Sequence, residues 1–146
     1  MKRYNHLIIG VVFAIFALNF NCIGQVHGKL FTSKVANQKY GAVVDSVIFS
    51  VKDFQMLLKE TDKYAMFKIV NNSVIILGDG RKVLFPENAR IEPEDVFTLY
   101  SKSVIEDLIS VGDADSVYFE QRKEVFTISV GNVTMEIGIL CPPICD

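Results

Sequence analysis

Two parts of the sequence repeat one order of predicted elements, and this order constrains the fold more than any other feature. A β-rich run comes first, at Val43–Phe49 in one part and Val96–Tyr100 in the other. A helical pattern follows, and then three further β-rich runs. Because the connections between these last runs are short, neighbouring strands must be antiparallel. The pattern therefore predicts an α+β fold.

The first predicted helix starts with a capping signal. Ser50 and Asp53 form a Ser-x-x-Asp box, with Asp in place of the usual Glu. Phe54, Leu57 and Leu58 then recur at helical spacing, which predicts one buried apolar stripe.

The second predicted helix has a similar start. Ser103 and Glu106 form a capping box, and Gly112 is placed to end the helix. Its apolar stripe consists of Val104, Ile105, Leu108 and Ile109.

Six short runs have the composition of strands. Asn71-Asn72 and Gly78-Asp79-Gly80 separate the first three, and both residue types accept the positive φ of tight hairpin turns. Phe126, Ile128 and Val130 share one face of the fifth run, while the opposite face carries Val125, Thr127 and Ser129. The predicted strands are 65–70, 73–77, 81–85, 116–120, 124–130 and 133–140.

A shift of the chain by 51 residues aligns the two parts without gaps. We interpret residues 43–85 and 94–136 as possible half-repeats of a strand, helix and three-strand unit. The alternative is that any two capped helices followed by meanders align in this way, and the pair Lys68 and Phe119 breaks the phase. Matching pairs include Ser50 with Ser101, Leu57 with Leu108, Asp62 with Asp113, Val74 with Val125, and Gly80 with Gly131.

Together these patterns predict a single domain over residues 43–146. We expect an antiparallel sheet of about six to eight strands with both amphipathic helices on one face. Residues 25–42 have no sustained period and are predicted to be a flexible N-terminal arm. Residues 86–96 form an acidic connector between the two parts.

The N-terminus has the pattern of a secretory signal peptide. Lys2 and Arg3 precede an apolar run over residues 7–20. A transmembrane helix is the alternative, but it needs about 20 apolar residues, and Asn19 and Asn21 interrupt the run. The sequence therefore predicts export to the periplasm or the extracellular space.

Cleavage is predicted after Gly24, so that the mature chain begins at Gln25, because Cys22 and Gly24 supply small residues at −3 and −1. The alternative is lipidation of Cys22, which would tether the protein to a membrane. The usual lipoprotein box has Leu three residues before the cysteine and a small residue directly before it, where this chain has Asn19 and Asn21.

Composition narrows the classes of partner. The 146 residues are 50% hydrophobic and 22% charged, which excludes a disordered chain, and the formal net charge is −2. Loss of Lys2 and Arg3 would leave 13 basic and 17 acidic residues, a charge of −4. Since nucleic-acid and anionic-membrane binding need a concentrated basic footprint, neither partner is predicted.

Cys141 and Cys145 are separated by two prolines and an isoleucine. A disulfide between them needs Cα atoms within about 7 Å, whereas a polyproline path would hold them about 12 Å apart. We therefore predict a turn, closed by a Cys141–Cys145 disulfide. The alternatives are intermolecular disulfides and a weak metal site, because the Cys-x3-Cys spacing resembles that of copper-delivering envelope proteins and two thiolates suit Cu(I).

Conventional catalysis has little support in the sequence. His27 is the one histidine of the predicted mature chain, so a Ser/His/Asp or Cys/His site lacks a well-placed base. We predict no cofactor and no catalytic residue, although clustered carboxylates leave an unfamiliar enzyme as an alternative. These carboxylates are Glu92, Glu94, Asp95, Glu106, Asp107, Asp113 and Asp115.

The sequence as a whole favours a non-enzymatic binding domain of the cell envelope or extracellular space. Tyr118 is predicted to point outward from the sheet, so the uncovered sheet face is either a binding surface or simply a solvated face. The expected partner is an unidentified protein or envelope component. The two alternatives to a binding domain are a thiol or Cu(I) handler, using Cys141 and Cys145, and the enzyme of unfamiliar type with clustered carboxylates.

Overall fold

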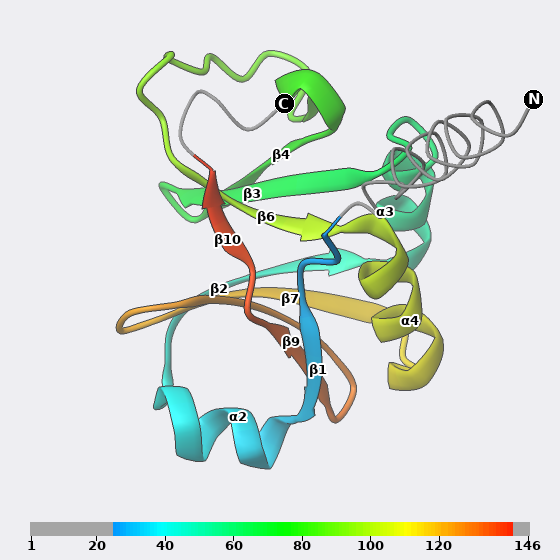
Figure 1. Ribbon diagram of the computed structural model, residues 1–146, viewed down its shortest axis with the longest axis vertical. Helices are drawn as coiled ribbons and strands as arrows, with labels where there is room; N and C mark the ends of the chain where they lie inside the picture. The colour runs from blue at the N-terminus through cyan, green and yellow to red at the C-terminus, as the bar shows by residue number, and fades with distance from the viewer. Residues whose placement is uncertain (1–24, 142–146) are drawn as a thin grey trace, which may run out of the picture.

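The computed structural model describes residues 25–141 and has an α+β fold built on two antiparallel sheets (Figure 1). The predicted class is confirmed, but the predicted single sheet with two helices is wrong. The described residues form two five-stranded sheets and three α-helices. Within this part of the chain, no helix combines the length and apolar character needed to cross a membrane.

Sheet A is the lower sheet of Figure 1, with strand order β1-β9-β8-β7-β2. Its strands are β1 (Lys29–Thr32), β2 (Val43–Ser50), β7 (Ser116–Arg122), β8 (Phe126–Val130) and β9 (Val133–Glu136).

Sheet B is the upper sheet, with order β10-β6-β3-β4-β5. Its strands are β3 (Tyr64–Val70), β4 (Ser73–Leu77), β5 (Val83–Phe85), β6 (Phe97–Ser101) and β10 (Ile139–Cys141). A 3-10 turn, η1 (Asp79–Arg81), lies between β4 and β5.

The exchange of first strands explains why there are two sheets. β2 pairs with β7, and β6 pairs with β3, so the first strand of each part joins the three strands of the other part. Side-chain alternation predicts which face of a strand is buried but not which strand lies beside it. The sequence pattern therefore predicted most of the strands without predicting their pairing.

Helices α3 (Val51–Leu58) and α4 (Lys102–Gly112) start directly after β2 and β6. The predicted N-cap of α3 is confirmed, since Ser50 Oγ accepts a hydrogen bond from the Asp53 N–H at 3.4 Å. The predicted cap of α4 at Ser103 is wrong. Ser101 is the N-cap residue, and its Oγ accepts from the His27 N–H at 2.8 Å instead of from its own helix.

The main core lies between the two sheets. Phe67 of sheet B stacks on Phe119 and Phe126 of sheet A, with ring centroids 5.4 and 6.0 Å apart. The apolar stripes of α3 and α4 close the same core, as predicted, through side chains such as Phe54 and Ile105 that are fully buried. Aromatic pairs at these separations add to the free energy of burial.

Residues 29–40 differ from the expected flexible arm. They form β1 and α2 (Ser33–Tyr40), and β1 pairs with β9 along its whole length. The segment has weak periodicity because α2 buries little apolar surface, with Ala36 its only fully buried residue. Its attachment is largely polar and is described below.

The predicted strand 133–140 is divided in two. β9 ends at Glu136, Ile137 has a φ of +65°, and β10 then joins the other sheet. Gly138 permits this crossing, since a Cβ there would lie 2.6 Å from Thr98 Cγ2. In element order, residues 43–85 and 97–136 each read strand, helix and three strands. Duplication of the unit stays a prediction.

Candidate functional site

The outer face of sheet A, which points away from sheet B, has two unlike parts. Helix α2 lies beneath one part, at the bottom of Figure 1, and contacts β1 and β9. The other part, on β2 and the first half of β7, is exposed. The covered part buries charged and hydroxyl side chains, whereas the exposed part presents two large apolar side chains, Ile48 and Tyr118, to solvent, which reverses the usual arrangement.

Arg122 organises the covered part and is only 2% exposed. Its Nη1 donates to Asn37 Oδ1 at 2.8 Å and to the carbonyl oxygen of Gly41, so it binds both the middle and the end of α2. Its Nε donates to Thr127 Oγ1 at 3.1 Å, and its Nη2 forms an ion pair with Glu120 Oε2 at 3.2 Å. This guanidinium therefore fastens α2 to sheet A.

A chain of hydroxyl groups extends the same network. Thr127 and Ser129 donate to Glu120 Oε2 at 3.0 and 2.9 Å. Thr134 lies 2.9 Å from Ser129 Oγ and 3.0 Å from Ser33 Oγ at the start of α2. Because the buried charges of Arg122 and Glu120 have these partners, the cost of removing them from water is offset.

Glu136 lies at the far end of the covered part. It is 7% exposed, and its Oε2 has no hydrogen-bond partner among the described residues. Burial raises the pKa of Tyr40, and the neighbouring Glu136 carboxylate raises it further. Burial, followed by the charge of Glu136, also raises the pKa of Tyr100, whose hydroxyl donates to the Phe126 carbonyl oxygen.

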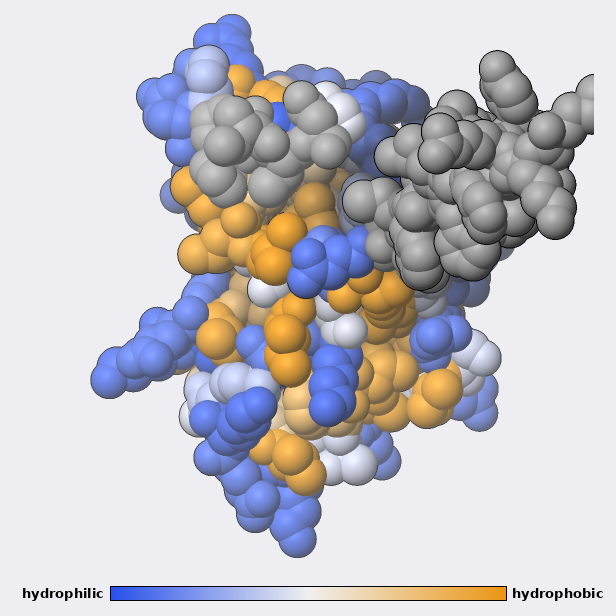
Figure 2. Space-filling view, in the orientation of Figure 1, coloured by the Kyte–Doolittle hydropathy of each residue, from blue (hydrophilic) through white to orange (hydrophobic). Residues whose placement is uncertain are grey.

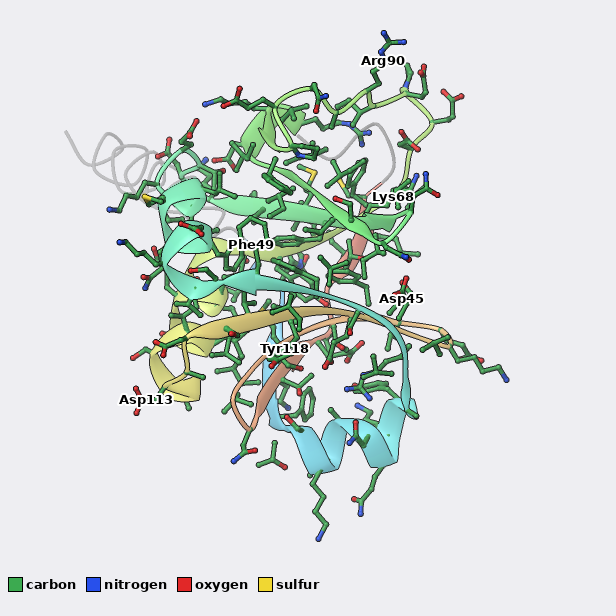
Figure 3. All side chains as sticks on the ribbon, turned by 180° about the vertical axis from the view of Figure 1, so that it is seen from behind. Asp45, Phe49, Lys68, Arg90, Asp113 and Tyr118 are labelled. Carbon is green, nitrogen blue, oxygen red and sulfur yellow. The ribbon has the colours of Figure 1, made fainter. Side chains whose placement is uncertain are left out.

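We call the exposed part the open face and define it by Ser46, Ile48 and Ser50 of β2 and Ser116 and Tyr118 of β7. Ile48 is 62% exposed, and Tyr118, its register partner, is 37% exposed. Figure 3 shows Tyr118 on the outer side of sheet A, whereas Phe49 points between the sheets. The structure therefore agrees with the outward orientation predicted for Tyr118.

β2 is also an edge strand. Among the described residues it pairs only with β7, so its other backbone edge has no strand beside it. Val47 and Phe49 on its inner face are half-buried, and the Phe49 ring meets the Phe85 ring of sheet B at 5.0 Å. The core is therefore partly open along β2.

A groove of about 1050 Å³ lies between α3 and α4. It contains three of the predicted carboxylates, Glu106, Asp113 and Asp115, but not Asp107. Three lysines share the groove, Lys52, Lys59 and Lys102, so its charge is mixed. The other predicted carboxylates lie in the connector, where Asp95 forms an ion pair with Lys68 at 2.5 Å.

Asp79 has the most extensive hydrogen bonding of the acidic residues outside sheet A. Its Oδ2 accepts from the backbone N–H groups of Asp62 and Lys63 and from the Thr61 hydroxyl, and its Oδ1 accepts from the Tyr64 N–H. Burial alone would raise the pKa of Asp79, but these hydrogen bonds outweigh it and hold the pKa below its ordinary value. This carboxylate fixes the turn after α3.

His27 lines a smaller cavity of about 520 Å³ beside Tyr64, with ring centroids 6.0 Å apart. Apolar residues also gather over β10, in the centre of Figure 2. Leu140 there is 72% exposed, but β10 leads directly into residues outside the described range. Neither surface supports an assignment of its own.

The predicted terminal features involve residues that the structure does not describe. Cys145, Cys22 and the cleavage site at Gly24 lie outside residues 25–141. Cys141 is described and fully buried in the smaller apolar cluster on the outer side of sheet B. Gln25 is exposed. The Cys141–Cys145 disulfide, the signal peptide and the weak metal site stay predictions.

No protein-family model matches the chain, and neither a curated protein nor a solved structure matches it. Across residues 25–141, no group of three or more His, Cys, Asp or Glu side chains is placed to hold a metal ion.

The sequence patterns missed the Arg122–Glu120 network and the exposure of Ile48. Two signals could have found them. The second face of residues 125–129 and residue Thr134 carry hydroxyl side chains, which typically signal a polar partner when a face is buried. Ile48 lies between Ser46 and Ser50 on one side of the first β-rich run, so an outward apolar residue could have been predicted there.

Proposed function

We propose that the chain is a small exported, non-enzymatic interaction domain and that the open face is its contact surface. The observation that carries the proposal is the pair Ile48 and Tyr118, two large side chains that stand side by side and exposed on adjacent strands. Protein contact surfaces are enriched in aromatic residues surrounded by small polar ones. The three serines of the open face provide such surroundings.

The rigidity of the surface supports this proposal. Val117 and Phe119, the neighbours of Tyr118 in β7, are fully buried, and Tyr118 lies across from Ser129 in β8. The Arg122 network holds the other end of β7. A contact surface on such a support loses little conformational entropy on binding.

Photocrosslinking tests the proposal in the source organism. The photoreactive amino acid p-benzoyl-phenylalanine replaces Tyr118, and a matched control replaces Val111 of α4, which is 63% exposed. We expect a discrete adduct with another protein from position 118, none from position 111, and loss of the first adduct in Ile48→Lys. Equal crosslinking from both positions, or no adduct from position 118, would overturn the proposal.

Export is the second part of the proposal and has a separate test. Intact mass of the protein from its source organism, before and after reduction and alkylation, measures the N-terminus and the cysteine state together. A chain that begins at Gln25 with two blocked thiols supports export and the Cys141–Cys145 disulfide. A chain that begins at lipidated Cys22 would place it on a membrane, and two reactive thiols would favour the thiol or Cu(I) alternative.

A further inference from the structure

The four outermost strands of the two sheets differ greatly in length. β1 has four residues, and β5 and β10 have three each, whereas β2 has eight. A long edge strand presents a row of backbone donors and acceptors that another strand can pair with. β2 is therefore the edge best suited to strand addition.

β2 also lacks most features that block such pairing. Proteins protect an edge with lysine, proline, short strands or bulges. β2 contains no lysine, arginine or proline, and its one charged residue is Asp45. Its irregularity lies between Val43 and Asp45, so Ser46 to Ser50 form a regular strand.

The regular part of β2 is self-complementary. The residues Ser46-Val47-Ile48-Phe49-Ser50 form a pattern that reads the same in both directions, with a serine at each end and three apolar residues between. An antiparallel pairing about Ile48 places Ile48 opposite its own copy and Val47 opposite Phe49. Each serine meets a serine, so every cross-strand pair joins side chains of like polarity.

We propose that two copies of this chain associate through β2, antiparallel and with the two-fold axis at Ile48. The two A sheets then form one ten-stranded sheet, and each copy covers the half-buried Val47 and Phe49 of the other. The inference extends the proposed function, because the open faces join into one apolar stripe with Ile48 at its centre and a Tyr118 on either side. It does not depend on a second protein.

The register also avoids charge repulsion. Asp45 lies beyond the five paired residues, and no other charged side chain belongs to β2. A stable dimer usually buries about 1,200–2,000 Å² of surface, and five residue pairs form a small contact. We therefore expect a weak dimer whose population depends on protein concentration.

Cysteine crosslinking of the full chain tests the register. In Ile48→Cys the two thiols face each other across the axis, within the distance that a disulfide allows. In the control Ser46→Cys, the two copies of residue 46 are four positions out of register, or about 13 Å apart along the strand. Both variants keep the native cysteines. We expect a covalent dimer from Ile48→Cys only; no dimer, or equal dimer from both, would overturn the register.

Sedimentation velocity over a range of concentrations tests the association itself. Ile48→Lys places two ammonium groups opposite each other and should weaken the association at least about tenfold. Val111→Lys is the matched control, since Val111 is 63% exposed and Ile48 is 62% exposed. A wild-type chain that stays monomeric at the highest concentration, or equal weakening in both variants, would overturn the proposal.

The outcomes separate this inference from the proposed function. With the photoreactive residue at Ser116 of the open face instead, Tyr118→Lys leaves the β2 edge unchanged, so it should remove the adduct with another protein and leave a dimer. If the chain is monomeric but position 118 still crosslinks to another protein, the self-association is wrong and the interaction domain stands. If it is dimeric and position 118 yields only an adduct of twice the chain's own mass, the self-association stands and the contact with another protein is wrong.

Discussion

The covered part and the open face belong to one side of one sheet, yet they differ in every physical respect. Under α2 the side chains are charged or hydroxylated and buried, and Arg122 and Glu120 are its central pair. On β2 and the start of β7 two large exposed side chains, Ile48 and Tyr118, lie among serines. A sheet face selected only for stability would have the opposite distribution, because apolar burial drives folding and buried charge costs free energy.

The difference indicates that the two parts have different roles. The polar network gives α2 a defined position through directional hydrogen bonds, although the helix has little apolar surface of its own. The open face contributes little to the fold, since Ile48 leaves most of its side chain in water. The proposed contact outside the chain would explain its composition.

Among the substitutions that follow, removal of the Arg122 guanidinium should lower the free energy of unfolding most. Arg122→Met leaves Glu120 buried without its cation, and we expect a loss of about 3–5 kcal/mol in the free energy of unfolding, measured by urea titration. Arg90→Met, at an exposed position in the connector, should change it by less than about 0.5 kcal/mol. Equal effects would show that the network does not fasten α2.

The variant Asp79→Asn tests whether a loss of stability at one site leaves a distant element, helix α2, unaffected. Asp79→Asn puts an amide donor among four hydrogen-bond donors, and we expect a loss of about 2–3 kcal/mol. Hydrogen exchange should show faster opening around Tyr64 and unchanged protection in α2. Faster exchange in α2 as well would contradict the separate fastening of that helix.

The same carboxylate predicts a pH dependence. Its pKa is lower in the folded chain than in the unfolded chain, so the stability it provides is fully present above its ordinary value of about 4. This stability is lost as the pH falls through the lower folded pKa. Urea titrations at several acidic pH values should therefore show a steeper loss for the wild type than for Asp79→Asn.

A single hydroxyl of the network should have a smaller effect. Thr134→Val keeps the shape of the side chain but removes its contacts with Ser33 and Ser129. We expect a loss of about 1 kcal/mol and faster exchange at the start of α2. Thr98→Val in β6, where no side-chain hydrogen bond of Thr98 occurs among the described residues, is the control and should be nearly neutral.

The smallest effect on stability is expected at the open face. Ile48→Ser should change the free energy of unfolding of the monomer by less than about 0.5 kcal/mol, because the side chain is mostly exposed. The unfolding measurement should be made at low protein concentration, where association does not contribute to stability. A loss of several kcal/mol would mean that Ile48 supports the fold and would remove the contrast.

Much of the fold could be predicted from the sequence, because the patterns that predict helices, turns and strands are local. The capping box at Ser50, the hairpin residues Asn71 and Asn72, and the alternation through Phe126 all act over a few residues. The exchange of β2 and β6 between the sheets was not readable, since it depends on contacts between residues far apart in the chain.

The candidate site could be predicted only in part from the sequence, for a related reason. The outward orientation of Tyr118 follows from alternation alone. The burial of Arg122 required α2, whose attachment is polar and leaves no apolar stripe to detect. A hydroxyl-rich strand face is ambiguous by itself, because water or a covering helix can satisfy it equally well.

Amide hydrogen exchange at two protein concentrations tests the central contrast most directly. Raising the concentration should increase the protection of amides in Ser46 to Ser50, where a second β2 would lie, and leave those of α2 unchanged. Unchanged protection in β2 at every concentration, or a gain of equal size in α2, would contradict the assignment of the β2 edge as a surface of self-association.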